Sequence, residues 1–158
     1  MKLTLGLVLW LVGACSGASV GATEKRVWEY SLPLDDDGQM ILSWGYPPGT
    51  GDIEIEMKAN CTGWMGIGIL NPNLQWADLT MAGYDDATGL GYLEDRFVDT
   101  ANPINGGTLD TSNDQFLQSA TYEGPWSIVQ FTRKIDTGDS PQDVPITVSS
   151  SSFIKKGK

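Results

Sequence analysis

Residues 63–97 decide the fold, and they read GWMGIGILNPNLQWADLTMAGYDDATGLGYLEDRF. The first strand of this segment alternates bulky residues with Gly66 and Gly68. Glycine within a strand usually marks the close approach of another group, and the facing sheet is the simplest candidate for that group. Turn-forming residues divide the remainder into further strands. The predicted strands and turns of this β-meander are, in chain order, 64–69, 71–73, 77–84, 85–89 and 92–97.

Alternation of bulky and polar residues predicts strands in the rest of the chain. The clearest is 52–59, in which every second residue, from Ile53 to Ala59, is apolar and would face a core. Further strands are expected at 27–32, 40–44, 116–122, 126–134 and 144–148. Residues 99–113 are rich in Asn, Gly, Thr and Asp and are expected to form a long surface loop. No segment has helical spacing over three turns, so we predict an all-β, antiparallel β-sandwich.

The 158 residues suffice for one core and not for two ordinary domains. Residues 1–22 have the pattern of a signal peptide, because Lys2 precedes an apolar run that is too short to span a bilayer. Cleavage is expected after Ala18 or Ala22, and a lipoprotein signal lipidated on Cys15 is the alternative. The predicted domain is 23–148, followed by a flexible, serine-rich and basic tail at 149–158. We therefore expect a secreted protein with no membrane insertion after signal cleavage.

The charge distribution restricts the class of partner. Six of the ten basic residues and all twenty acidic residues lie within 23–154, so this part carries about fourteen negative charges. Nucleic acid and anionic membrane surfaces are poor partners for such a field. Solubility alone explains an acidic extracellular protein, and cations, cationic partners or a mineral surface are the alternatives.

Cysteine usage excludes a disulfide framework in the processed chain. Cys61 is the only cysteine outside the signal-like segment. It lies within Asn60-Cys61-Thr62, an N-glycosylation acceptor that would place Asn60 on a surface loop. Cys61 would pair with another chain or remain a buried free thiol, and both alternatives stay open.

The order of several motifs resembles the DOMON domain, known as the amino-terminal module of dopamine β-monooxygenase-like enzymes. The motifs are GWMGIG at 63–68, ADL at 77–79, an aromatic residue with two aspartates at 84–86, DRF at 95–97 and FTRKIDTGD at 131–139. The resemblance covers residues 28–147. It implies an immunoglobulin-like or jelly-roll-like sandwich that lacks the immunoglobulin disulfide.

Three aspartates stand at strand ends that a meander could bring to one edge of the sandwich, namely Asp78, Asp95 and Asp114. Hard cations such as Ca²⁺ bind several carboxylate and carbonyl oxygens in loose geometry. The resemblance implies a cation site formed by the carboxylates of Asp78 and Asp114 and the carbonyls of Leu79 and Arg96. The alternative is that Asp78 and Asp114 only cap turns.

The chain contains no histidine, which removes the usual base of nucleophilic triads and the usual ligand of redox copper. Copper hydroxylation is therefore not expected of this chain, and no catalytic residue is predicted. Haem is not expected either, because the loop in which the resemblance implies a methionine ligand reads Leu74-Gln75-Trp76. Adjacent acids at 85–86 and 94–95 are typical of solvated turns rather than of a glycosidase pair.

Aromatic residues offer a second hypothesis, a pocket for a small molecule or saccharide. The candidate lining residues are Trp64, Trp76, Tyr84, Tyr92 and Trp126. The alternative is that these side chains are ordinary core. We predict a non-catalytic binding module for a small molecule, a saccharide or an extracellular protein. The alternatives are a haem-binding electron-transfer module, a truncated amino-terminal domain of a dopamine β-monooxygenase-like enzyme, and an acidic matrix or mineral-associated protein.

Overall fold

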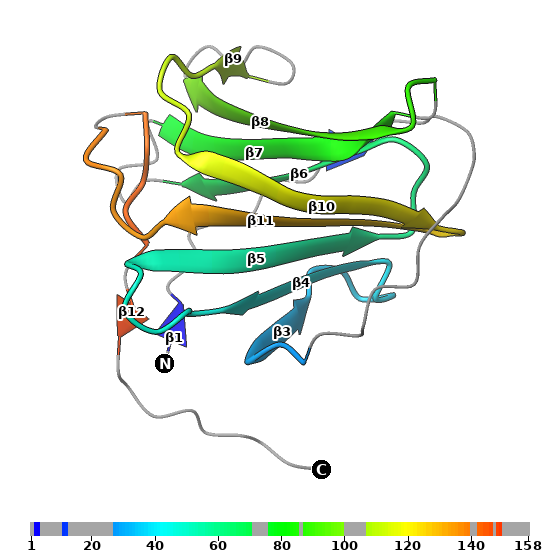
Figure 1. Ribbon diagram of the computed structural model, residues 1–158, viewed down its shortest axis with the longest axis horizontal. Helices are drawn as coiled ribbons and strands as arrows, with labels where there is room; N and C mark the ends of the chain where they lie inside the picture. The colour runs from blue at the N-terminus through cyan, green and yellow to red at the C-terminus, as the bar shows by residue number, and fades with distance from the viewer. Residues whose placement is uncertain are drawn as a thin grey trace.

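The structure, a computed structural model, is a sandwich of two antiparallel sheets (Figure 1). It describes residues 27–70, 76–85, 87–99, 107–139 and 142–146, together with the backbone of 2–3, 11–12 and 148–149. The described residues contain strands and turns but no helix, and so no helix with the length and apolar character to cross a membrane. The predicted all-β, antiparallel sandwich is confirmed.

Each sheet has five strands. The first has the order β10 (Gln115–Glu123), β11 (Trp126–Lys134), β5 (Asp52–Ala59), β4 (Met40–Gly45) and β3 (Tyr30–Pro33). The second has the order β2 (Leu11–Val12), β6 (Trp64–Leu70), β7 (Trp76–Asp85), β8 (Leu90–Asp99) and β9 (Thr108–Leu109). A small pair joins β1 (Lys2–Leu3) to β12 (Val148–Ser149). Edge strand β10 packs across β8 and β7 of the other sheet, which brings their side chains between the layers.

Strand periodicity builds the core. In β5, the apolar set from Ile53 to Ala59 is buried, as predicted, and the polar set between its members is half-buried. Beside β5 in the same sheet, Val129 and Phe131 of β11 are at most 1% exposed. The second sheet contributes Met65 and Ile67 to the same cluster. Burying such side chains contributes about 1.5–3 kcal/mol each, so this contact between the two layers is the main source of stability.

The glycines of β6 face away from the other sheet, so the prediction that the facing sheet approaches them is wrong. Met65 and Ile67 point into the core, and residues between them in a strand must point out. A Cβ on Gly66 would lie 3.7 Å from a Leu79 methyl, and one on Gly68 would lie 4.0 Å from the same methyl. The glycines therefore make room for Leu79, whose side chain is buried on the outer surface of the second sheet.

Two other predictions need correction. Val144 and Ile146 are buried, but residues 144–146 form no strand; β12 begins at Val148. Instead, the Ile146 N–H donates to the Ile135 carbonyl, which holds this segment against the end of β11. The predicted loop at 99–113 contains β9, which pairs with Arg96 and Phe97 of β8.

Several predictions fall where the structure cannot test them. The signal peptide at 1–22 is described only through the backbone of β1 and β2. The turn at 71–73 lies outside the described residues, as does the tail beyond Ser149. The turn at 85–89 is confirmed, because the Gly89 N–H donates to the Asp85 carbonyl at 2.7 Å.

Candidate functional site: a buried carboxylate cluster

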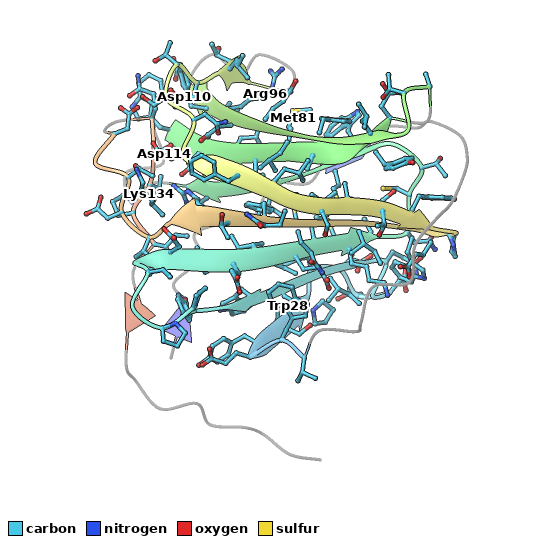
Figure 2. All side chains as sticks on the ribbon, in the orientation of Figure 1. Trp28, Met81, Arg96, Asp110, Asp114 and Lys134 are labelled. Atoms are coloured by element: carbon cyan, nitrogen blue, oxygen red, sulfur yellow. The ribbon has the colours of Figure 1, made fainter. Side chains whose placement is uncertain are left out.

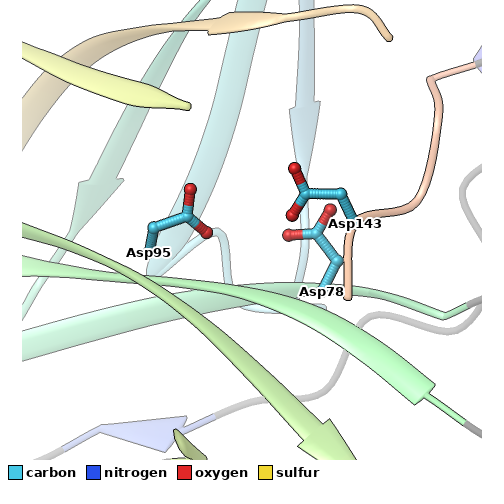
Figure 3. A group of neighbouring side chains, drawn as sticks. All are labelled: Asp78, Asp95 and Asp143. Carbon is cyan, nitrogen blue, oxygen red and sulfur yellow. The ribbon is translucent and has the colours of Figure 1, made fainter. Parts of the chain in front are cut away.

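Three aspartates meet between the sheets at one end of the sandwich. Asp78 lies on β7, Asp95 on β8 and Asp143 on the segment that follows β11. One carboxylate oxygen from each lies within 4.8 Å of those of the other two (Figure 3). The three side chains, which we call the carboxylate cluster, are 2%, 4% and 7% exposed, respectively. Carboxylates are almost never buried to this degree without partners, so the surroundings of the cluster decide what it can do.

Strand register explains why two of these acids meet. Inward-facing positions of β7 and β8 pair as Thr80 with Asp95 and Asp78 with Phe97, which places both aspartates on the inner face. On the other sheet, Arg133 pairs with Ile53, a core residue, and therefore also points inward. The interior is thus apolar in its middle and ionic where β7, β8 and β11 come together.

Arg133 is the central cation of the site. Its Nη2 donates to Asp78 Oδ2 and, at 3.1 Å, to the Val144 carbonyl. The Val144 N–H donates to the same Asp78 oxygen at 3.0 Å. Both side chains of this ion pair are 2% exposed, so its strength comes from geometry inside the protein and not from a solvated surface contact.

Asp95 is held by neutral donors instead. Its Oδ1 accepts a hydrogen bond from Gln115 Nε2 at 2.9 Å, and its Oδ2 accepts one from the Asp114 N–H at 3.1 Å. Gln115 is oriented in turn by Thr80, whose hydroxyl donates to Gln115 Oε1 at 2.7 Å. These bonds tie the start of β10 to β7 and β8 through buried polar groups.

Burial makes ionisation of the cluster costly. Loss of hydration raises the pKa of Asp78 to about 7, although Arg133 and the Val144 N–H oppose the rise. The same cause raises the pKa of Asp95 to about 6, against the Asp114 N–H. Burial also raises the pKa of Asp143. Near neutral pH the cluster is therefore only partly ionised.

The cluster has more acceptors than its protein donors can neutralise. Fully ionised, the three carboxylates carry three negative charges against the single positive charge of Arg133. A neighbouring acid adds to this excess, because Asp110 raises the pKa of both Asp95 and Asp143. In the described part of the chain, Asp110 Oδ2 is buried without a hydrogen-bond partner, as are Nε and Nη1 of Arg133. Unpartnered buried polar atoms are uncommon and often mark a place for an ion or water.

The donor set fits a hard divalent cation. Ligand oxygens lie 2.3–2.6 Å from Ca²⁺, so two oxygens on one ion are at most about 5 Å apart. The three cluster oxygens meet that condition within their 4.8 Å separation. Two surplus negative charges also match one divalent ion. Protons and Arg133 would compete with the ion for the same oxygens.

The predicted cation ligands are only partly brought together. Leu79 and Arg96 are paired in register on β7 and β8, beside Asp78. The Arg96 side chain points away from the cluster: it donates to Glu94 at 2.8 Å and to the Gly107 carbonyl at 3.0 Å. Asp114 contributes its N–H to the cluster, while its carboxylate accepts from Lys134 Nζ at 2.9 Å. Figure 2 shows Asp110, Asp114 and Lys134 at the same end of the sandwich.

Asp143 is the cluster member that sequence analysis missed. It lies outside any strand, where no periodicity indicates its direction, and its neighbour Val144 holds the segment at the site through hydrogen bonds with Asp78 and Arg133. The turn residues between Asp136 and Asp139 were a signal for a compact loop, since their side chains accept local backbone N–H groups. They gave no signal of contact with β7.

The five aromatic residues of the pocket hypothesis are divided among different surfaces. Trp64 pairs in register with Gly83, and the Tyr92 ring lies against that glycine, on the outer surface of the second sheet. Trp126 carries Lys58 Nζ 4.7 Å above its ring, on the first sheet. Trp76 contacts Phe97, with ring centroids 6.0 Å apart. Tyr84 is half-buried near the end of β7. A pocket shared by all five stays a prediction.

The glycosylation acceptor lies at the end of β5. Asn60 is exposed, and its side-chain nitrogen donates to Gln39 Oε1. Next to it, Cys61 is a half-buried free thiol, and burial raises its pKa. A thiol with a raised pKa is a poor nucleophile, so Cys61 has no features of a reactive cysteine.

Comparison with known proteins agrees with this architecture. The family model described as the DOMON domain matches residues 36–155. This chain belongs to the DOMON domain family. The DOMON chain is 30% identical over 122 residues to MOXD1 homolog 2 of Drosophila melanogaster, an overlap that covers 77% of the chain and 15% of the relative.

Two mammalian proteins are similar over a slightly longer stretch. DBH-like monooxygenase protein 1 of Mus musculus is 27% identical over 134 residues, which is 84% of the DOMON chain and 20% of the relative. The human protein of the same name is 26% identical over the same number of residues. The DOMON chain therefore spans about a fifth or less of the length of these curated relatives.

Proposed function

We propose that this DOMON chain is a secreted, non-catalytic binding module whose two sheets are joined by a divalent cation, Ca²⁺ being the best fit. The observation that carries the cation is the carboxylate cluster, whose three oxygens lie mutually within 4.8 Å. When all three acids are ionised, they carry two more negative charges than Arg133 offsets. In the loaded module, oxygens of Asp78, Asp95 and Asp143 would hold the ion. The ion would offset their mutual repulsion without adding any chemistry of its own.

A non-catalytic role follows from the residues available. The chain has no histidine, and Cys61 has a raised pKa, so neither of the usual activated groups is at hand. Asp78 and Asp95 have shifted pKa values, but both side chains are buried between the layers, at 2% and 4% exposed. Their pKa shifts therefore support a structural, ion-binding site better than acid–base catalysis.

Isothermal titration of the metal-free protein with CaCl₂ at pH 8 tests the cation. We expect one bound ion, with a Kd near the 10⁻⁴–10⁻³ M typical of extracellular calcium modules. The Asp143→Asn variant should lose this binding, while Glu123→Gln, which removes an exposed acid at the end of β10, should retain it. Equal binding by both variants would show that calcium associates with the acidic surface and not with the cluster.

A second candidate rests on the relatives. Because the matched proteins include two named DBH-like monooxygenases, the module could act as one domain of a longer monooxygenase-like protein. An antibody against the domain distinguishes the two cases on a blot of the native source. The full chain of 158 residues has a mass of 17.1 kDa. A band somewhat below that mass after signal cleavage, or a heavier one if Asn60 is glycosylated, supports an independent module, whereas a band several times larger supports the longer protein.

The haem-binding and mineral-associated alternatives have direct tests. A Soret absorption band in the purified protein would indicate haem, and we expect none. Retention on calcium carbonate that survives the Asp143→Asn change would indicate a mineral-binding surface outside the cluster.

A further inference from the structure

One edge of the second sheet is covered by a segment that has the pattern of a signal peptide. β2 pairs antiparallel with β6, with Leu11 opposite Gly66 and Val12 opposite Met65. Both β2 residues lie within residues 1–22, the segment for which the sequence predicts cleavage. Removal of that segment would leave β6 as the edge strand of the sheet, with a row of backbone N–H and C=O groups facing outward.

β6 has none of the features that protect an exposed edge strand. Its sequence, WMGIGIL, contains no charged residue and no proline. Its pairing with β7 runs in continuous register from Trp64 to Leu70, without a bulge. Native edge strands are usually protected by charged side chains, prolines, bulges or a covering segment. Of these devices, β6 has only the covering segment, and within the described residues that segment is β2.

An apolar hollow lies between β6 and the facing layer. Its lining includes Leu42 and Trp44 of β4, Ile67 and Ile69 of β6, and Ile146. The inner side of β6 is therefore apolar along its length. A β6 edge without β2 would combine unpaired backbone groups with adjacent apolar side chains, a combination that favours the addition of another strand.

The sequence of β6 is nearly symmetric about Ile67. The pairs of residues equidistant from Ile67 are Gly66 with Gly68, Met65 with Ile69, and Trp64 with Leu70. Two copies of β6 related by a two-fold axis at Ile67 would run antiparallel, so that each residue would face its counterpart in the other copy. Glycine would then meet glycine on the outer surface, and large apolar residues would meet on the inner one. No charge would lie on either strand of the interface.

We propose that, once residues 1–22 are removed, β6 pairs with β6 of a second copy of this chain, so that the two second sheets become one continuous sheet. Until then, β2 occupies the edge and keeps the chain monomeric. The removal step rests on the proposed function, because it requires secretion, whereas the pairing of β6 does not. The acidic body of the chain opposes association elsewhere, and the uncharged strand keeps like charges out of this interface.

The first test releases β6 in the full chain with the double variant Leu11→Pro/Val12→Pro. Proline has no N–H and does not fit within a ladder, so β2 should no longer cover the edge. Sedimentation velocity should give one copy, 17.1 kDa, for the native full chain and twice that mass for the variant. We expect the association constant of the variant to exceed that of the native chain by at least about tenfold. Melting curves verify that the variant is folded.

A third substitution locates the contact. Gly68→Lys, added to the double-proline variant, places like charges close to the two-fold axis and should return the protein to one copy. A Cβ at Gly68 would lie 3.8 Å from the Asp78 carbonyl oxygen, an ordinary contact, so this variant should fold. Gln118→Lys adds the same charge at an exposed position of β10 and is the matched control, which should leave the dimer intact.

The secreted form provides a second test that does not need the proline variant to fold. Amino-terminal sequencing shows whether residues 1–22 are absent, and the processed chain should sediment as two copies. A processed chain that stays monomeric would overturn the pairing of β6 and leave secretion standing. A secreted chain that retains residues 1–22 would contradict signal cleavage, and the proline variant would then judge the pairing by itself.

Three results with the variants would overturn the proposal. A folded double-proline variant that sediments as one copy would show that the released edge takes no second copy. A dimer that persists after Gly68→Lys would place the contact on another surface. Assemblies larger than two copies would contradict a closed, two-fold pairing of β6.

Discussion

The two sheets meet along β8 and β10 in two different ways. Near the start of β8, Gly91 faces Ala120 so closely that a Cβ on the glycine would overlap the Ala120 Cβ. Toward the other end of the same strands, Asp95 accepts hydrogen bonds from the Asp114 N–H and the Gln115 side chain. One contact is steric and the other is polar, although both join the same pair of strands.

The comparison shows which part of the sandwich can respond to its surroundings. A steric contact has no titratable group, so its contribution to stability should not change with pH or ions. The polar end contains carboxylates whose pKa values are raised to about 7 for Asp78 and about 6 for Asp95. Its contribution should therefore depend on protons and on any cation that replaces them.

Replacing Arg133 with Met should produce the largest effect. The change leaves Asp78 buried without its ionic partner, and breaking a buried pair in this way costs about 3–5 kcal/mol. Urea unfolding at pH 8 measures the loss. The loss should be smaller at pH 5.5, where Asp78 can take up a proton.

The neighbouring pair provides the control for Arg133. Lys134→Met removes the ion pair with Asp114, but the Lys134 side chain is 51% exposed, so little change in stability is expected. Equal losses for the two variants would show that burial does not distinguish these pairs.

The next largest loss of stability is expected from a substitution at the steric contact between Gly91 and Ala120. Gly91→Ala forces the two sheets apart at Ala120, and overpacking of this kind costs about 1–3 kcal/mol. The double variant Gly91→Ala/Ala120→Gly should recover much of the loss, because removal of the Ala120 Cβ makes room for the new Cβ at position 91. Unfolding at pH 5.5 and pH 8 should give the same difference at both values. A pH-dependent difference would mean that the two ends are coupled.

The pH dependence of the native protein should be of similar size. The folded pKa of Asp78, about 7, lies above the ordinary aspartate value of 3.8, so the folded state binds an extra proton between these values. Stability should therefore rise by about 2 kcal/mol as the pH falls from 8 to 5.5, and this gain is lost as the pH increases through 7.

Asp78→Asn tests the origin of this slope, because asparagine cannot titrate. The variant should show a flatter dependence of the unfolding free energy between pH 5.5 and 8 than the native protein. An unchanged slope would assign the titration to other groups.

The sequence predicted the structure correctly where the type of a side chain indicates whether that side chain is buried or exposed. Alternation in β5 located both the strand and its buried face, because each side chain indicates whether it meets core or water. It failed for Gly66 and Gly68, since a residue without a side chain gives no indication of its direction. The strand predicted at Val144 and Ile146 was also wrong, because apolar residues are buried both in strands and in irregular segments.

The candidate site was predictable only in part for a related reason. Asp78 and Asp95 were marked by their positions at the ends of meander strands, and register then joined them. Asp143 reaches them from a segment without periodicity; its neighbour Val144 bonds to Asp78 across 66 residues of sequence. Which oxygens Lys134 and Arg133 neutralise likewise depends on packing between the sheets, which no local pattern encodes.

The most direct test of the cation-joined sandwich is the melting temperature of the metal-free protein, measured with and without 10 mM CaCl₂ at pH 8 and at pH 5.5. Calcium at ten to one hundred times its Kd should add about 1.4–2.7 kcal/mol at pH 8, a rise of several degrees. At pH 5.5 the rise should be clearly smaller, because protons occupy the same oxygens. A melting temperature unaffected by calcium at pH 8, or raised equally at both pH values, would contradict the account.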